Sequence, residues 1–193
     1  MFIGIYNKSI ILTFIGLFCC VIGVSFCFEG NVLISSILLV IAGICDCFDG
    51  YVASLVKRTD KEKQYGIELD SLVDAVCFGM YPIVIATSLG YTSIINIIIY
   101  CIYIFCGITR LGYFNVDEEN TKHFKGLPIT TMSFILPTIL IFTQSEIVLM
   151  ITFLLVAILF ITNIKINKVD LKTKKLFLIT AIIIIALLIL SKI

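Results

Sequence analysis

Four aspartates lie inside hydrophobic stretches of this 193-residue chain, where charged side chains are rarely found. They are Asp46, Asp49, Asp70 and Asp74, and Glu68 lies beside them. A charged side chain at the centre of a membrane-spanning helix costs about 2.5 to 3.5 kcal/mol on insertion scales. Acids that are kept at this cost indicate a functional site, and their spacing shows how they can act together.

The spacing places these aspartates on two helical stripes. The first stripe holds Asp46, Asp49, Gly50 and Ala53, which fall within about 100° of one another around a helix. The second holds Gly66, Asp70 and Asp74, which drift by only about 40° at each four-residue step. The connection from Ser54 to Tyr65 is short, so the two helices should lie antiparallel and side by side. We therefore expect the four carboxylates to converge in one pocket.

Clustered carboxylates repel one another unless cations lie among them, and neither stripe contains a basic residue. Oxygen ligands select hard ions such as Mg²⁺ or Mn²⁺, and a pair of ions suits displacement at phosphorus. We expect the four aspartates to bind two such ions, while Gly50 and Gly66 let a ligand approach the backbone. The alternatives are acids that anchor helix ends at the membrane surface and acids that line an ion-transport pathway. The chain lacks the paired, interrupted helices that many transporters contain.

The two half-motifs, Asp46-x2-Asp49-Gly50-x2-Ala53 and Gly66-x3-Asp70-x3-Asp74, together resemble the signature of the CDP-alcohol phosphatidyltransferases. The departure is Ser54, which stands where that family usually has arginine. The resemblance implies that this arginine contacts the phosphates or the nucleotide of the substrate. Ser54 carries no charge and can donate only one hydrogen bond, so Lys57 or Arg58 could take over the role from the loop.

Three segments resemble the integral-membrane phosphatidylserine synthases within that family. They are Gly66-Ile-Glu-Leu-Asp70-Ser-Leu-Val-Asp74 running on to Phe78-Gly79, Arg110-Leu-Gly-Tyr113-Phe-Asn115, and Gly126-Leu-Pro128. Many members carry a second arginine where Tyr113 stands. The resemblance implies an enzyme that transfers the phosphatidyl group of CDP-diacylglycerol to L-serine and releases CMP. Another acceptor, such as glycerol 3-phosphate or inositol phosphate, and a catalytically inactive relative are the alternatives.

The resemblance also implies roles for single residues and a homodimer. Asp46, Asp49 and Asp70 would be the main metal ligands, and Asp74 would be a shared ligand and the general base. The nucleotide and substrate positions would be Gly50, Ala53, Ser54 and Gly66. Arg110 could hold the serine carboxylate through two parallel hydrogen bonds, with Lys125 as a second candidate. For Arg110 the alternative is a side chain that only anchors its helix at the membrane surface.

The composition requires lipid as the solvent of these helices. Hydrophobic residues make up 60% of the chain and charged residues 14%, whereas soluble domains contain about half and about a quarter. The mean hydropathy is +1.14. The net charge of +1 gives no electrostatic reason to expect nucleic acid as a partner. The 8 cysteines lie in or beside apolar runs, without the paired spacing of zinc sites, and His123 is the single histidine.

The hydrophobic runs predict an all-α, polytopic transmembrane helical bundle of about six to eight spans, in one domain over residues 1–193. The metal and nucleotide motif lies within residues 46–74. The runs extend over Ile10–Phe28, Val32–Leu55, Gly66–Leu89, Ile94–Phe114, Ile129–Phe142, Ile147–Ile164 and Leu176–Leu190.

The basic residues predict the orientation. If the N-terminus is cytoplasmic and each run crosses once, then all but one of the 14 basic residues lie on the cytoplasmic side, the exception being Lys192. This is the asymmetry of the positive-inside rule. We therefore expect a multi-pass membrane protein whose N-terminus and aspartate site are cytoplasmic.

Overall fold

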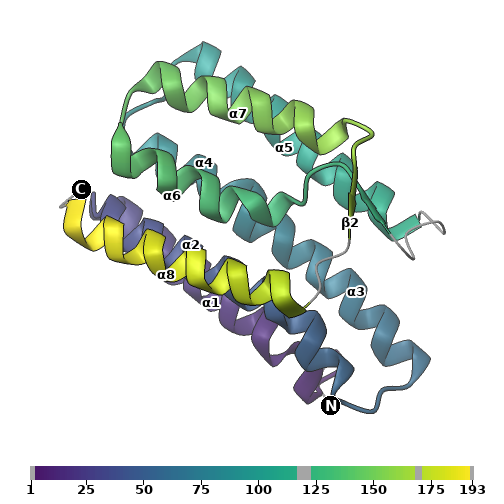
Figure 1. The fold of residues 1–193 in the computed structure, drawn as a ribbon. Coiled ribbons are helices and arrows are strands. Elements are labelled where there is room, and N and C mark those ends of the chain that lie inside the picture. The colour runs from purple at the N-terminus through teal and green to yellow at the C-terminus, as the bar shows by residue number, and fades with distance from the viewer. Residues whose placement is uncertain (1–2, 117–122, 168–170, 192–193) are drawn as a thin grey trace.

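The computed structural model describes residues 3–116, 123–167 and 171–191, which are almost entirely helical (Figure 1). The α-helices are α1 Ile11–Phe28, α2 Val32–Ser54, α3 Asp60–Asp74, α4 Tyr81–Ser88, α5 Ile94–Val116, α6 Met132–Phe142, α7 Glu146–Ile161 and α8 Leu171–Ser191. Two 3-10 turns, η1 Lys8–Ile10 and η3 Ile129–Thr131, precede α1 and α6, and the π-helical turn η2 Ala75–Met80 joins α3 to α4. Three of the predicted cytoplasmic or terminal lysines, Lys122, Lys168 and Lys192, lie outside the described residues.

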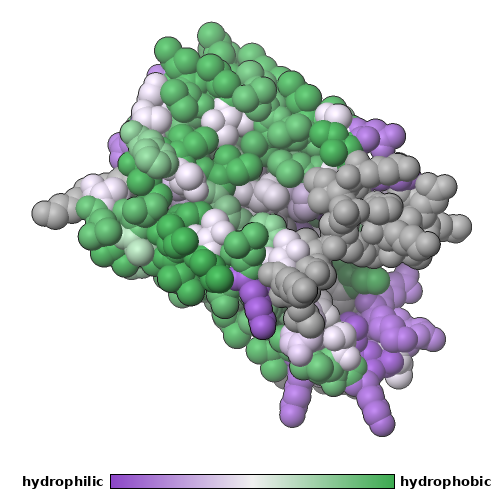
Figure 2. All heavy atoms as spheres, viewed as in Figure 1, coloured by the Kyte–Doolittle hydropathy of each residue, from purple (hydrophilic) through white to green (hydrophobic). Residues whose placement is uncertain are grey.

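Five helical stretches in the described part of the chain are long and apolar enough to cross a membrane. They are Lys8–Phe28, Val32–Ser54, Asp60–Ser88, Ile94–Val116 and Thr173–Ser191, and the apolar stretches Ile129–Phe142 and Glu146–Ile161 are shorter. Each predicted hydrophobic run is therefore helical, and the predicted polytopic membrane bundle is confirmed. Figure 2 shows apolar side chains over most of the face in view, with hydrophilic ones gathered mainly near the N-terminus and the first turns of α3.

The helices form a bundle in which α5 and α7 lie along one side and α1, α2 and α8 along the other, with α4 and α6 between them (Figure 1). α2 packs along α1 and also contacts α6 and α8, whereas α3 packs on α1 and α5. The close side-by-side packing that we predicted for α2 and α3 is therefore wrong. α8 is held by a small apolar cluster in which Val40 of α2 meets Ala181, Ile184 and Leu188.

α3 begins six residues before the predicted start at Gly66, because a capping box fixes its first turn. The Thr59 hydroxyl accepts a hydrogen bond from the backbone N–H of Glu62 at 3.3 Å. In return the Glu62 carboxylate accepts one from the backbone N–H of Thr59 at 2.7 Å. Part of the predicted basic loop is thus helical, and α3 carries its polar first turns out of the apolar bundle.

The π-helical turn η2 follows directly after Asp74, and its wider winding changes which groups the helix presents. The Phe78 carbonyl accepts a hydrogen bond from the Tyr103 hydroxyl of α5 at 2.5 Å. The Tyr81 hydroxyl donates to the Ser35 carbonyl of α2 at 2.7 Å. These bonds tie the helix that carries Asp70 and Asp74 to two other helices, so the position of η2 in the bundle is fixed from both sides.

Two three-residue strands were not predicted. β1 His123–Lys125 pairs antiparallel with β2 Lys165–Asn167, with His123 opposite Asn167. The pair joins the segments that follow α5 and α7 at one end of the bundle. The fold class remains all-α.

Gly43 allows α2 and α6 to approach closely, one turn before Asp46. A Cβ atom at residue 43 would lie 2.0 Å from the Oγ and 2.8 Å from the Cβ of Ser133. Ser133 is fully buried, and its hydroxyl donates to the Thr130 carbonyl at 2.6 Å. The missing side chain of Gly43 therefore brings the η3–α6 segment against the part of α2 that bears the acids.

We predict that Gly43→Ala lowers the free energy of unfolding by about 1–3 kcal/mol, because α2 and α6 must separate to admit the methyl group. The measurement is thermal unfolding of purified protein in detergent, followed by helical circular dichroism. Gly112→Ala in α5 is the matched control, because no atom lies within 4 Å of its Cβ position. Equal unfolding temperatures for the two variants would contradict the close approach.

Candidate active site

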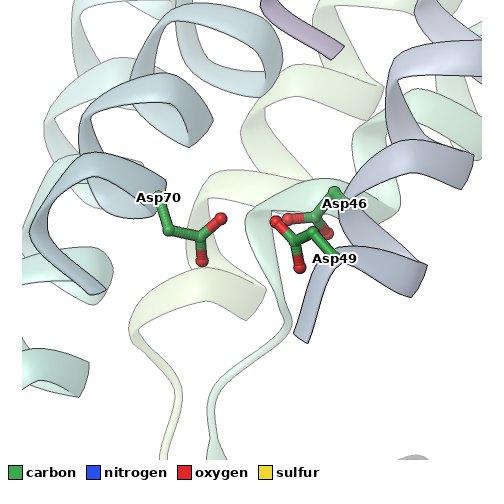
Figure 3. A group of neighbouring side chains, drawn as sticks. All are labelled: Asp46, Asp49 and Asp70. Carbon is green, nitrogen blue, oxygen red and sulfur yellow. The ribbon is translucent and has the colours of Figure 1, made fainter. Parts of the chain in front are cut away.

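Three of the predicted metal ligands come together. One carboxylate oxygen from each of Asp46, Asp49 and Asp70 lies within 4.8 Å of the others. Figure 3 shows Asp46 and Asp49 extending from α2 toward Asp70, which extends from α3 to meet them. The two stripes converge as their spacing predicted, although the helices that carry them pack mainly on other partners.

Asp74 lies next to this set of three and is the most deeply buried of the four acids, with 7% of its surface exposed. Its carboxyl group neighbours that of Asp46, and the carboxyl group of Asp70 neighbours that of Asp49. Each acid of α2 therefore has an acid of α3 as a neighbour. Asp74 differs from the other three in its seclusion from solvent.

Two threonines outside the aspartate motif donate hydrogen bonds to the cluster. The Thr130 hydroxyl of η3 donates to Oδ2 of Asp46 at 2.7 Å. The Thr13 hydroxyl of α1 donates to Oδ2 of Asp49 at 3.2 Å. Sequence reasoning missed both, because a threonine in an apolar run carries no signal of its own and its partner lies 84 or 36 positions away.

Two cationic side chains from different helices lie near the acids, and a third lies beside Gly66. Arg110 of α5 is close enough to Asp74 and Asp46 for electrostatic attraction, and Lys174 of α8 is close enough to Asp49. Arg58 precedes α3, and its Nη1 lies 3.7 Å from the position that a Cβ would occupy at Gly66. The sequence suggested Arg58 and Arg110 but gave no indication that the C-terminal helix contributes a charge.

The acids and their neighbours line a small cavity with a volume of about 10 Å³, close to what a single water needs. Its walls are completed by apolar side chains of α1 and η2, including Leu12 and Phe78. Carboxylate oxygens around so small a space are the ligands that hard divalent cations prefer. The residues present fit such an ion, and Asp46, Asp49 and Asp70 would hold it.

The predicted nucleotide and substrate positions follow the acids toward the end of α2 and the start of α3. Gly50 is exposed, and a Cβ there would meet nothing within 4 Å, so a ligand has room to reach the backbone. Ala53 is half-buried. Ser54 is exposed, but its hydroxyl donates to the Tyr51 carbonyl of its own helix at 2.6 Å. At Gly66 the neighbouring group is the Arg58 guanidinium.

A second, larger cavity of about 270 Å³ contains both predicted acceptor-binding residues, Arg110 and Lys125. Its other walls are Thr109, Tyr113, Phe160, Ile161, Thr162 and Asn163. The Lys125 ammonium donates to the Tyr113 hydroxyl at 3.2 Å. The Arg110 guanidinium lies 5.1 Å from the ring centroid of Phe114. Arg110 has only 8% of its surface exposed, so it differs from a side chain that anchors a helix at the membrane surface.

The arginine segment is also tied to the helix that bears Asp70. Asn115 and Ser71, the residue after Asp70, exchange hydrogen bonds at 3.0 and 3.2 Å. This contact fixes the end of α5 against α3. As a result Arg110, five residues before Asn115, has a defined position relative to the acids.

A model of the CDP-alcohol phosphatidyltransferase family matches residues 7–163. The chain belongs to this family. The match covers both half-motifs of aspartates, the arginine segment and the Gly126-Leu127-Pro128 segment. It ends before α8, so the helix that carries Lys174 lies beyond the matched part of the family.

Relatives of the chain include three proteins whose names specify a serine phospholipid product or a serine acceptor. An archaetidylserine synthase of Methanothermobacter thermautotrophicus is 33% identical over 148 residues, which are 74% of this chain and 61% of that protein. CDP-diacylglycerol–serine O-phosphatidyltransferases of Bacillus subtilis and Saccharomyces cerevisiae are 35% and 36% identical over 118 and 108 residues. These stretches cover 60% and 50% of this chain, and 64% and 38% of the two relatives. The chain therefore spans less than two thirds of the length of these relatives.

We predict that Asp49→Asn weakens the binding of Mn²⁺ by more than about 10-fold. Changing a residue that only orients a metal ligand already costs about 10-fold or more, and Asp49 is expected to be a ligand itself. The measurement is a titration of purified protein in detergent with Mn²⁺, with free ion followed by electron paramagnetic resonance. Glu68→Gln is the matched control, because Glu68 is an exposed acid two residues from Asp70. Unchanged affinity in Asp49→Asn, or an equal loss in both variants, would contradict the assignment.

Proposed function

We propose that the protein transfers the phosphatidyl group of CDP-diacylglycerol to L-serine, giving phosphatidylserine and CMP. The observation that carries this proposal is the position of Arg110, which neighbours the acid cluster on one side and lines the larger cavity on the other. A reaction of two substrates needs adjoining sites for a diphosphate and for an acceptor. The names of the relatives support serine as the acceptor.

The acid cluster would bind the diphosphate of CDP-diacylglycerol together with Mg²⁺ or Mn²⁺, and we propose two ions. The ions would neutralise the diphosphate and stabilise the charge on the departing CMP. Arg58 would add a fixed positive charge at Gly66, on the stripe of Asp70, in the role that Ser54 cannot fill. Gly50 would let the substrate approach the backbone of α2, and Ala53 and Ser54 would line the same path.

The cavity of Arg110 and Lys125 would bind serine, with the Arg110 guanidinium gripping its carboxylate. The serine hydroxyl would attack the phosphorus that bears the lipid. A new bond forms between that oxygen and phosphorus as the bond from phosphorus to the CMP oxygen breaks. Asp74 would accept the hydroxyl proton as general base, a role that suits a carboxylate shielded from solvent beside Arg110.

The protein would work in the membrane with its N-terminus and both cavities on the cytoplasmic side. The distribution of basic residues supports this sidedness. We further propose that residues 1–193 act as one domain and that two copies form a homodimer, as the resemblance implies.

The test is CMP release by purified protein in detergent with CDP-diacylglycerol, Mg²⁺ or Mn²⁺, and a panel of L-serine, glycerol 3-phosphate and inositol phosphate. We expect metal-dependent release with serine alone, and loss of turnover in Asp74→Asn protein that remains inserted in the membrane. Release with another acceptor would retain the chemistry but overturn the assignment of serine. No release from protein that still binds CDP-diacylglycerol would indicate an inactive relative. Wild-type activity in Asp74→Asn would remove it as the base.

Separate substitutions at the two arginines should affect the two substrates separately. We predict that Arg110→Lys raises the KM for serine by about 10-fold or more, because a lysine cannot make the two parallel bonds of a guanidinium. Arg58→Gln should instead raise the KM for CDP-diacylglycerol. Each variant controls for the other, and Lys57→Gln, at an exposed neighbouring position, should change neither constant. An Arg110→Lys variant with unchanged KM for serine would place the acceptor elsewhere.

A further inference from the structure

The Thr130 hydroxyl donates its hydrogen bond to Asp46 of another helix, although a carbonyl of its own segment would be enough to satisfy a buried hydroxyl. Thr130 has 9% of its surface exposed, and its hydroxyl donates at 2.7 Å to one oxygen of a carboxylate that belongs to the cluster of three. Nearby threonines satisfy their hydroxyls locally, as Thr131 does by donating to the Pro128 carbonyl at 2.7 Å. Thr130 instead reaches another helix.

We propose that Thr130 is a positioning residue that holds Asp46 in the orientation of a metal ligand. This inference rests on the metal site of the proposed function and adds to it a residue outside the aspartate motif. A carboxylate can rotate about its Cβ–Cγ bond, and a hydroxyl bonded to one oxygen stops that rotation. The other oxygen would then remain available to an ion. Loss of a group that orients a metal ligand in this way typically lowers the metal affinity by about 10- to 100-fold.

Thr130 also supplies a donor where Asp46 has mainly acceptors beside it. Asp46 lies close to Asp74 and Asp49, and both are acids. A hydroxyl donor compensates part of the repulsion without placing a competing cation at the site. Thr13 makes the corresponding, longer bond to Asp49 from α1. Both aspartates of α2 therefore receive a neutral donor from an element outside the two motif helices.

The segment before Thr130 is built to hold it in place. Gly126 has a φ of +75°, and a Cβ there would lie 2.2 Å from the Phe160 carbonyl oxygen, so only glycine fits. The backbone N–H groups of Gly126 and Leu127 donate to the carbonyls of Ile164 and Leu159, at 3.0 Å each. The Gly126-Leu127-Pro128 segment is thereby anchored on the end of α7.

The segment after Thr130 is held from the other side. The Thr130 carbonyl accepts the Ser133 hydroxyl, and Ser133 packs against Gly43, one turn from Asp46 on α2. Thr130 is thus fixed between α7 and α2 with its hydroxyl directed at Asp46. A rigid donor of this kind can fix a ligand, whereas one on a mobile loop cannot.

The test compares Thr130→Val, which removes the hydroxyl while keeping the shape, with Thr130→Ser, which keeps the hydroxyl. Thr131→Val is the matched control at the neighbouring position. Mn²⁺ affinity is measured on purified protein in detergent by electron paramagnetic resonance, and thermal unfolding is measured without added metal. We expect Thr130→Val to bind Mn²⁺ about 10- to 100-fold more weakly, and Thr130→Ser and Thr131→Val to bind near the wild-type affinity.

Wild-type Mn²⁺ affinity in Thr130→Val would overturn the inference, and so would an equal loss in Thr131→Val. If Thr130→Val does not fold, Thr130→Ala provides a second variant without the hydroxyl, to which the same two outcomes apply. The proposed function fails in a different way, since it requires metal-dependent CMP release by the unmodified protein. A wild-type protein that releases CMP with metal, beside a Thr130→Val variant with normal Mn²⁺ affinity, would leave the function intact and remove only the role of Thr130.

Discussion

The constraint on which this structure depends is the concentration of four carboxylates inside an apolar bundle. Charges of one sign repel strongly where water is scarce, and each buried carboxylate has also lost its hydration. Hydrogen-bond donors and cationic side chains from other helices compensate part of this repulsion. Thr13 and Thr130 donate to the acids of α2, while Arg110 and Lys174 attract them from α5 and α8. A divalent cation held by Asp46, Asp49 and Asp70 would complete this compensation, and the same ion would serve the chemistry of the proposed transfer.

Contacts elsewhere in the bundle bring these donors and cations, which are distant in the sequence, to the acids of α2 and α3. Gly43 lets α6 approach α2, and Gly126 lets its own segment rest against the Phe160 carbonyl at the end of α7. Hydroxyls of Tyr81 and Tyr103 fix the π-helical turn that follows Asp74. None of these residues would touch a substrate in the proposed reaction. They matter because a carboxylate displaced by about 0.5 Å is already a poor ligand or base.

The sequence predicts what depends on local periodicity and fails where distant parts of the chain meet. Helical spacing alone predicts that Asp46 and Asp49 share one face of α2 and that Asp70 and Asp74 share one face of α3, although the packing that brings the two faces together needed the structure. The hydrophobic runs follow from the length that a membrane requires. The start of α3 was misplaced because the capping box at Thr59 outweighs the polar character of its first turns. Thr130 was not found because its importance lies in a partner 84 positions away. Arg58 was suggested by charge, but its place beside Gly66 needed the structure.

Arg110 connects the two halves of the proposed reaction, and its surroundings suggest how they are coordinated. Its guanidinium is attracted by Asp74 and Asp46 and also lines the cavity assigned to serine. A carboxylate of the acceptor must therefore compete with two carboxylates of the protein for the same cation. Divalent cations bound to the acids would weaken the pull of Asp46 and Asp74, because their charge is then shared. The acceptor carboxylate would therefore be attracted to Arg110 more strongly once metal ions occupy the acid cluster. In the proposed reaction, the position of one buried arginine would thus link metal binding to acceptor binding.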